Sequence, residues 1–176
     1  MAKQLKQAVA EASVPAAPMK ALFERVEDYM DSNGWNYSKG EDKQAFAMDV
    51  AVTDGKVRVV LNVVESEGLQ QVLVYSIFPI FVPEHSRARM AEGITRINYA
   101  TSFGNFEMDL KDGEVRVRTV LEGDGFVAEP MIDRAVRKSL DLADQYQAAL
   151  LAIAFGNESP QKILEMAERA DGSTLQ

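Results

Sequence analysis

The chain has 176 residues, 47% of them apolar, and carries 19 Lys and Arg against 27 Asp and Glu, a formal net charge of −8. Cys is absent and His85 is the only histidine, which excludes disulfides, thiolate zinc sites and histidine-rich metal centres. The acidic balance is unlike that of nucleic-acid-binding proteins or of domains that dock on anionic lipid. No apolar run approaches the roughly 20 residues that span a bilayer, and the N-terminus lacks a signal-peptide pattern, so we expect a cytoplasmic protein.

Composition and patterning divide the chain into three parts. Residues 1–17 are rich in Ala, Lys and Gln and are predicted to form a flexible leader. Pro15 and Pro18 lie on either side of its end. Residues 18–156 form a single α+β domain, whose size lets it bury about 70% of the surface that its unfolded chain exposes. Residues 157–176 form a short amphipathic helix and a tail.

Three helices are predicted in the domain, over residues 18–32, 84–100 and 130–155, because apolar residues recur there at intervals of three and four. Asn33-Gly34 ends the first, since Gly tolerates the left-handed conformation of a helix C-terminus. A further helix begins at Ser159-Pro160, with Ser159 as its N-cap, and runs to about Ala170.

A hairpin with alternating apolar residues follows the first helix. Asp54-Gly55 is a strong turn signal. With these two as loop residues, the facing pairs are Val52/Val57, Val50/Val59, Met48/Leu61 and Phe46/Val63. All four pairs are apolar and share one face, which a slip of one residue would destroy.

A second hairpin repeats the pattern around Asp112-Gly113. Its predicted inward pairs are Leu110/Val115, Met108/Val117 and Phe106/Thr119. Its outward pairs, Lys111/Glu114, Asp109/Arg116 and Glu107/Arg118, are each of opposite charge. The two hairpins are alike in sequence, which is consistent either with an internal duplication or with two independent solutions of the same turn.

A third strand runs from about Leu69 to Phe78 and is apolar on both faces. Two prolines follow, so residues 78–83 are expected to leave the sheet in extended form. Assigned by parity, the outer face of the first three strands carries Val60, Val64, Val72 and Val74. These four residues are our candidate protein-interaction surface, because an apolar patch rimmed by charge is typical of a contact site. Cover by the leader or by the C-terminal helix is the alternative.

The predicted order is therefore α-β-β-β-α-β-β-α plus a C-terminal helix. Paired hairpins with helices mainly on one face indicate an α+β fold with an antiparallel sheet. No phosphate-binding loop is present in the sequence and no motif marks a nucleophile–base pair, so no catalytic, metal-binding or cofactor-binding residue is assigned. Trp35, after the first helix, is interpreted as a residue that locks the helix to the sheet, with ligand stacking as the alternative.

The segment from Arg96 to Arg116 resembles the YbjN family of bacterial proteins, which are labelled sensory transduction regulators. The resemblance rests on Arg96-Ile97-Asn98-Tyr99-Ala100, on Phe103-Gly104-Asn105-Phe106 and on the turn at Asp112-Gly113, and it extends from about Met19 to Phe155. It implies a fold similar to type III secretion chaperones, which often form dimers and present surfaces to partner polypeptides. It provides no catalytic residues.

Two functions remain open from the sequence. The first is a non-enzymatic, homodimeric protein-interaction module, a regulator, adaptor or chaperone-like protein, which binds a polypeptide partner or itself through the apolar sheet face. The second is a small-ligand sensor with a pocket between helices and sheet near Trp35. A carboxylate or divalent-metal enzyme is a third and weaker reading. No cofactor, nucleic acid or membrane partner is expected.

Overall fold

The computed structural model describes residues 20–41, 44–123 and 126–170. Four helices and a six-stranded antiparallel sheet make up this part of the chain, which confirms the predicted α+β class, and the predicted helices and strands follow one another in the predicted order. None of its helices is long and apolar enough to cross a membrane. The elements are α2 (Leu22–Ser32), β1 (Ser38–Lys39), β2 (Ala45–Val52), β3 (Gly55–Ser66), β4 (Leu69–Phe81), a 3₁₀ turn η1 (Glu84–Ser86), α3 (Arg87–Ala100), β5 (Asn105–Met108), β6 (Glu114–Gly123), α4 (Glu129–Phe155) and α5 (Pro160–Ala170).

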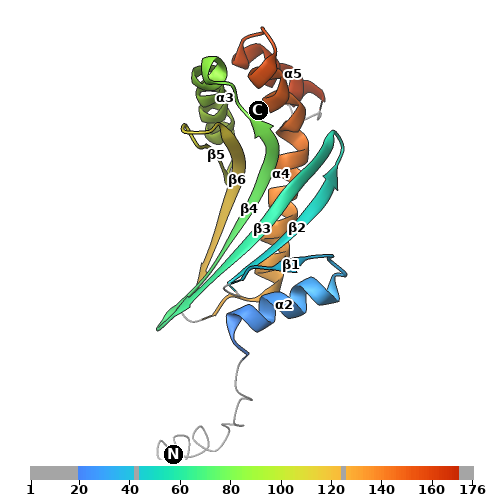
Figure 1. The fold of residues 1–176 in the computed structure, drawn as a ribbon, viewed down its shortest axis with the longest axis vertical. Helices are drawn as coiled ribbons and strands as arrows, with labels where there is room; N and C mark the ends of the chain where they lie inside the picture. The colour runs from blue at the N-terminus through green and yellow to red at the C-terminus, as the bar shows by residue number, and fades with distance from the viewer. Residues whose placement is uncertain (1–19, 42–43, 124–125, 171–176) are drawn as a thin grey trace, which may run out of the picture.

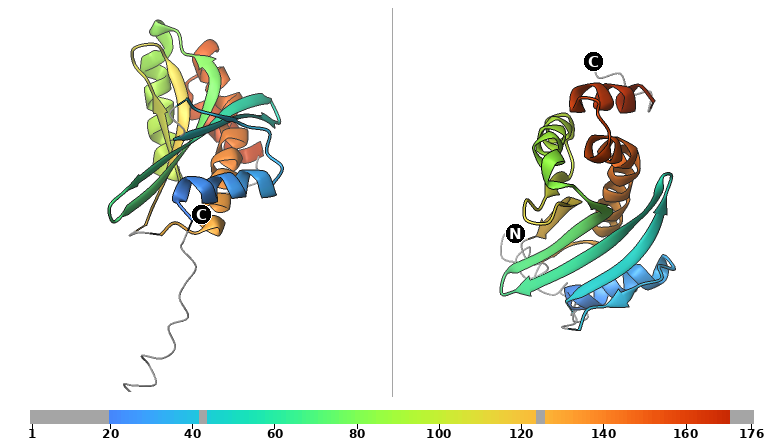
Figure 2. Two further views of the ribbon diagram at one scale, coloured as in Figure 1. Left: turned by 60° about the horizontal axis from the view of Figure 1, so that its bottom comes forward. Right: turned by 45° about the horizontal axis from the view of Figure 1, so that its top comes forward.

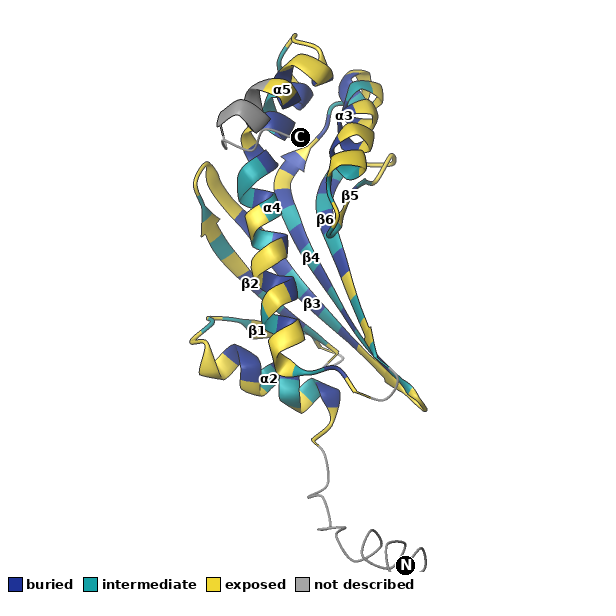
Figure 3. Ribbon diagram, turned by 180° about the vertical axis from the view of Figure 1, so that it is seen from behind, coloured by how far each residue is buried: buried dark blue, intermediate teal, exposed yellow. Residues whose placement is uncertain are grey.

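The strands are arranged in the order β1-β2-β3-β4-β6-β5, so β4 is shared by the first three-strand meander and the second hairpin. The long helix α4 crosses one face of this sheet (Figures 1 and 3). Helix α2 lies at one end of the sheet, and α3 and α5 lie at the other (Figure 2). The short strand β1 is an addition to the predicted order.

One apolar core lies between the sheet and α4. Helix α4 contributes residues at intervals of three and four, such as Ile132, Ala135, Val136, Ala143 and Leu150, all of which are buried. Facing them, the strands contribute the following buried side chains: Phe46, Met48, Val57, Val59, Leu61, Val63, Val72, Val74, Phe78, Phe106, Val115 and Val117.

The first hairpin has the predicted faces but a different register. Val52 pairs with Gly55 and Val50 with Val57, so the loop residues are Thr53 and Asp54 rather than Asp54 and Gly55. Helix α4 holds this turn, because Asp144 accepts hydrogen bonds from the N–H and hydroxyl of Thr53 and Gln147 donates to the Asp54 carbonyl. Because the shift amounts to two residues, every side chain keeps its predicted face.

The second hairpin also differs by two residues. Phe106 pairs with Val117, and a four-residue loop, 110–113, replaces the predicted two-residue turn. The carboxylates of Asp109 and Asp112 accept hydrogen bonds from main-chain N–H groups two residues further on, which stabilises the longer loop. Leu110, predicted to point inward, is 66% exposed in this loop.

Three helix ends can be compared with the prediction. Helix α2 begins at Leu22, where the main-chain N–H donates to Glu65 Oε2 at 2.9 Å, rather than at Pro18, which lies outside the described residues. Its predicted end is confirmed, since Gly34 has a φ of 67°. Ser159 Oγ accepts a hydrogen bond from the Lys162 N–H at 3.3 Å, which confirms the predicted cap of α5.

Strand β4 continues further than predicted. It extends to Phe81, which still pairs with Glu114 of β6, so the expected departure from the sheet at residue 78 is wrong. The register shifts between Ile77 and Phe81, where Pro79 has no N–H for the ladder.

Candidate interaction surface

Two of the four candidate residues lie on the wrong face for the predicted surface. Val72 and Val74 are completely buried beneath α4, because Val72 pairs with Val63 and Val74 with Leu61. Residues that face each other in a sheet share a face, and Leu61 belongs to the core. The assignment of Val72 and Val74 to the outer face is therefore wrong.

The error arises because β4 is apolar on both faces, so alternation alone does not fix its phase. The phase is fixed instead by the β3–β4 turn, in which Ser66 pairs with Leu69 across Glu67-Gly68. Gly68 has a φ of 78°, as a tight hairpin turn requires. Glu67-Gly68, read as a hairpin turn, could have predicted from the sequence which face of β4 is buried.

The face of the sheet away from α4, which we call the open face, is turned toward the viewer in Figure 1, and no helix of the described chain covers β3, β4 and β6 there. Val60 and Val64 lie on it as predicted, Val64 being 40% exposed. Sequence reasoning missed its central feature, an apolar row along β4, which we call the β4 row. Its members are Leu73, Tyr75, Ile77 and Phe81.

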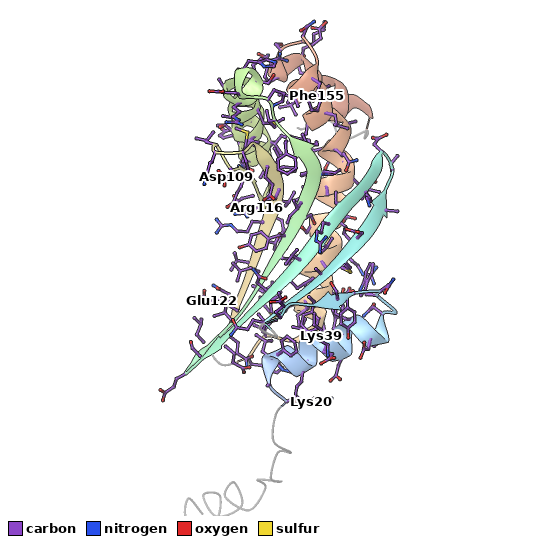
Figure 4. All side chains as sticks on the ribbon, in the orientation of Figure 1. Lys20, Lys39, Asp109, Arg116, Glu122 and Phe155 are labelled. Atoms are coloured by element: carbon purple, nitrogen blue, oxygen red, sulfur yellow. The ribbon has the colours of Figure 1, made fainter. Side chains whose placement is uncertain are left out.

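Charged side chains border the β4 row on the side of β5 and β6. Glu107 forms ion pairs with Arg116 at 3.1 Å and with Arg118 at 2.6 Å, close to the predicted outward pairing. The Arg116 guanidinium also lies 4.7 Å from the centre of the Tyr75 ring. Figure 4 shows Arg116 on the same side of the sheet. These contacts hold the aromatic ring and its charged neighbours in one arrangement.

On the other side, β2 and β3 carry charges of their own. Asp49 faces Arg58 across the β2–β3 ladder, and both side chains are exposed. Arg58 in turn faces Ile77 of the β4 row across the β3–β4 ladder, so this charged pair lies directly beside the row. The open face therefore has an apolar middle and a charged rim on both sides, which is the composition of a protein contact site.

Trp35 packs against the core, half-buried, beside the end of α2. This agrees with its interpretation as a structural residue. Nearby, burial raises the pKa of Tyr29, whose hydroxyl donates to Asp133 of α4 at 3.4 Å. Four cavities of the described residues have linings that do not include Trp35. No observation favours a ligand pocket beside it.

The largest of these cavities, about 510 Å³, lies between α4 and the loop that follows α3. Arg134, Lys138 and Asp141 stand at its rim, and the side chains of Phe103 and Leu142 line it. Its lining mixes cations, a carboxylate and apolar groups, so it could accommodate a small polar molecule. It lies on the helical side of the sheet and shares no residue with the open face.

The chain also matches a protein family. The model of the YbjN family, described as "Putative bacterial sensory transduction regulator", matches residues 22–152. The chain belongs to the YbjN family. A solved structure, that of YbjN from E. coli, described as a putative transcription regulator, shares 13% identity, with a TM-score of 0.52 over 73% of this chain and 92% of that chain. This structural likeness shows the fold. A search of curated proteins finds no match.

The family match confirms the resemblance drawn from residues 96–116. It covers α2 to α4, so the entire sheet and the β4 row lie within the YbjN domain. Helix α5 begins after the matched region.

Proposed function

We propose that this YbjN-family chain is a non-enzymatic protein-interaction module that binds a polypeptide through the open face of its sheet. The β4 row carries the proposal. Phe81 is 65% exposed, and Leu73, Tyr75 and Ile77 are half-buried, on a face where the described chain places no helix. Covering these groups would remove apolar surface from water, worth about 25 cal/mol for each Å².

The partner is either a different polypeptide or a second copy of this chain in a homodimer. Light scattering on the purified protein distinguishes these, since a mass twice that of the 19.5 kDa chain indicates the homodimer. Charge introduced on the face should then dissociate it. We compare Leu73→Lys/Ile77→Lys with Ala88→Lys/Ala91→Lys, which adds the same charge at exposed positions of α3.

Site-specific crosslinking tests the contact directly. A photoreactive phenylalanine at Tyr75 lies on the open face, whereas the same group at Tyr99 lies on α3 and is 95% exposed. We expect a discrete crosslinked product in host lysate from position 75 and none of that mass from position 99. Equal crosslinking from both positions, or from position 99 alone, contradicts the proposal.

A further inference from the structure

Strand β2 leaves an unpaired edge on the sheet. Its neighbour β1 pairs only with Phe46 and Ala47, so the segment Met48–Val52 has no partner strand on that side among the described residues. Exposed edges of this kind are sites where further chains add to a sheet.

The direction of the main-chain groups follows from three hydrogen bonds. The carbonyls of Ala45 and Ala47 accept hydrogen bonds from the N–H of Gly40 and the hydroxyl of Ser38, on the β1 side. The Gln44 carbonyl instead accepts the Val63 N–H on the β3 side. Main-chain groups alternate in direction along a strand. The N–H and C=O groups of Asp49 and Ala51 therefore point away from β3, into the open edge.

At the end of this series of edge-facing main-chain groups, an N–H already donates to an oxygen atom from outside the sheet. Thr53 follows Ala51 in the alternation, and its N–H donates to Asp144 Oδ1 at 2.5 Å. Its hydroxyl donates to the other carboxylate oxygen at 3.1 Å. A side chain of α4 thus occupies the position that a carbonyl of a neighbouring strand would take.

Hollows lie on both sides of this edge. One, of about 330 Å³, separates the edge from α4 and is lined by Val50, Val52 and Leu140. The other, of about 310 Å³, lies beside Tyr37 and Asp49. Successive side chains of an added strand point to opposite faces, so alternate residues would enter the two hollows.

The charged side chains around the edge indicate which kind of polypeptide would bind there. The carboxylates of Asp141 and Asp144 border the hollow beside α4. Lys138 forms a 3.4 Å ion pair with Asp141. The exposed cations Lys56 and Arg58 of β3 face Ala51 and Asp49, on the side of the sheet away from α4. A second copy of this chain would bring the same carboxylates together, on a protein with a net charge of −8.

We propose that the edge Met48–Val52 binds one extended segment of a different polypeptide, in which Lys or Arg alternates with β-branched residues. Its main chain pairs with Asp49 and Ala51. Its cationic side chains enter the hollow beside α4, where their apolar stems lie along the lining and their charges face Asp141 and Asp144. Its β-branched side chains lie over the hollow beside Tyr37. This contact is separate from the β4 row. It extends the proposed function, in that it also requires a polypeptide partner.

Amide hydrogen exchange tests the pairing with a capped peptide of about eight residues that alternates valine and lysine. In the free chain, we expect the Asp49 and Ala51 amides to exchange quickly, because no strand pairs with them. With the peptide bound, we expect both to slow by about tenfold or more. The same peptide with glutamate in place of lysine is expected to leave them unchanged.

Two further probes remove the edge hydrogen bonds without altering the charges. Ala51→Pro deletes an edge N–H, which a strand tolerates on its open side, and should weaken peptide binding by about tenfold. Ala51→Thr keeps the N–H and should leave binding within about threefold. On the peptide side, N-methylation of alternate residues removes the donors that would face β2, so binding is lost for one of the two methylation patterns even if Ala51→Pro fails to fold.

The proposal is overturned if Asp49 and Ala51 are already protected in the free chain. It is also overturned if the lysine peptide does not bind, or if it binds with protection elsewhere or with equal affinity to the glutamate peptide. The Leu73→Lys/Ile77→Lys variant should bind the peptide normally. Loss of the Tyr75 crosslink in that variant with intact peptide binding, or the reverse pattern, therefore shows which of the two contacts has failed.

Discussion

The hydroxyl groups of Ser76 and Ser139 lie 2.8 Å apart inside the core, where they form a buried hydrogen bond between β4 and α4. Both residues are fully buried among apolar side chains. Each hydroxyl satisfies the other, so the pair fixes the position of the helix along the central strand at no cost in unpaired polar groups.

We therefore expect Ser76→Ala to lower the free energy of unfolding by about 1–3 kcal/mol, because it leaves the Ser139 hydroxyl buried without this partner. Ser139→Ala should have a similar effect. The double variant should cost less than the sum, since it removes both polar groups. Urea denaturation of all four proteins measures the coupling, and additive losses would show that the hydroxyls do not interact.

Charge substitutions on β4 should separate its two faces. Val74→Glu places a carboxylate against α4 and is expected to cost about 3–5 kcal/mol or to prevent folding. Leu73→Lys places a cation on the open face and should cost less than about 1.5 kcal/mol. Thermal and urea unfolding provide the comparison. Equal losses from these adjacent positions would contradict the assignment of faces.

The same two positions show what the sequence could predict. Alternation fixed the buried face of β2, β3, β5 and β6 correctly, because the other face of each carries charged residues as well. It failed on β4, where both faces are apolar and the phase depends on the turn at Glu67-Gly68. The registers of both hairpins missed by two residues, because tertiary contacts to Thr53 and side-chain hydrogen bonds of Asp109 determine the loops. Of the candidate surface, Val60 and Val64 were placed correctly, and the edge of β2 was not foreseen.

Two glycines with similar backbone angles should differ in their tolerance of alanine. Gly113 has a φ of 87°, and a Cβ there would lie 2.4 Å from the Val82 carbonyl oxygen. Gly68 has a φ of 78° with no atom within 4 Å of the same position. We expect Gly68→Ala to cost about 1–2 kcal/mol for its backbone conformation alone. Gly113→Ala should cost at least about 1–3 kcal/mol more, because the β5–β6 loop must move away from β4.

Stability curves of the two alanine variants give the difference directly. Near-equal losses would mean that the contact between Gly113 and Val82, which includes a 2.9 Å hydrogen bond from the Val82 N–H, is not maintained in solution.

The pKa of the Tyr37 hydroxyl should lie above that of an ordinary tyrosine. Its hydroxyl donates to Asp31 Oδ1 at 2.8 Å, and this hydrogen bond raises its pKa to about 12. The folded-state pKa lies above the unfolded value of about 10, so the stabilisation is complete below pH 10 and is lost as the pH rises through 12.

Ultraviolet titration of the phenolate should show one group near pH 12 that disappears in Tyr37→Phe. Asp31→Asn removes the negative charge and should bring the Tyr37 pKa down. An unchanged titration curve in Asp31→Asn would contradict the role of this carboxylate.

The position of β4 between two hairpins has a consequence for folding kinetics. Strands β2, β3 and β4 follow one another through tight turns, so their pairing requires only short loops to close. The pairing of β4 with β6 joins Val74 to Thr119, which is 45 residues further along the chain. The entropy of closing this long loop is paid before its contacts form, so we expect the meander to assemble first and the second hairpin to dock on it more slowly. Substitutions at the β2–β3 and β3–β4 contacts of the meander should then change the folding rate, whereas those in β5 should chiefly change the unfolding rate.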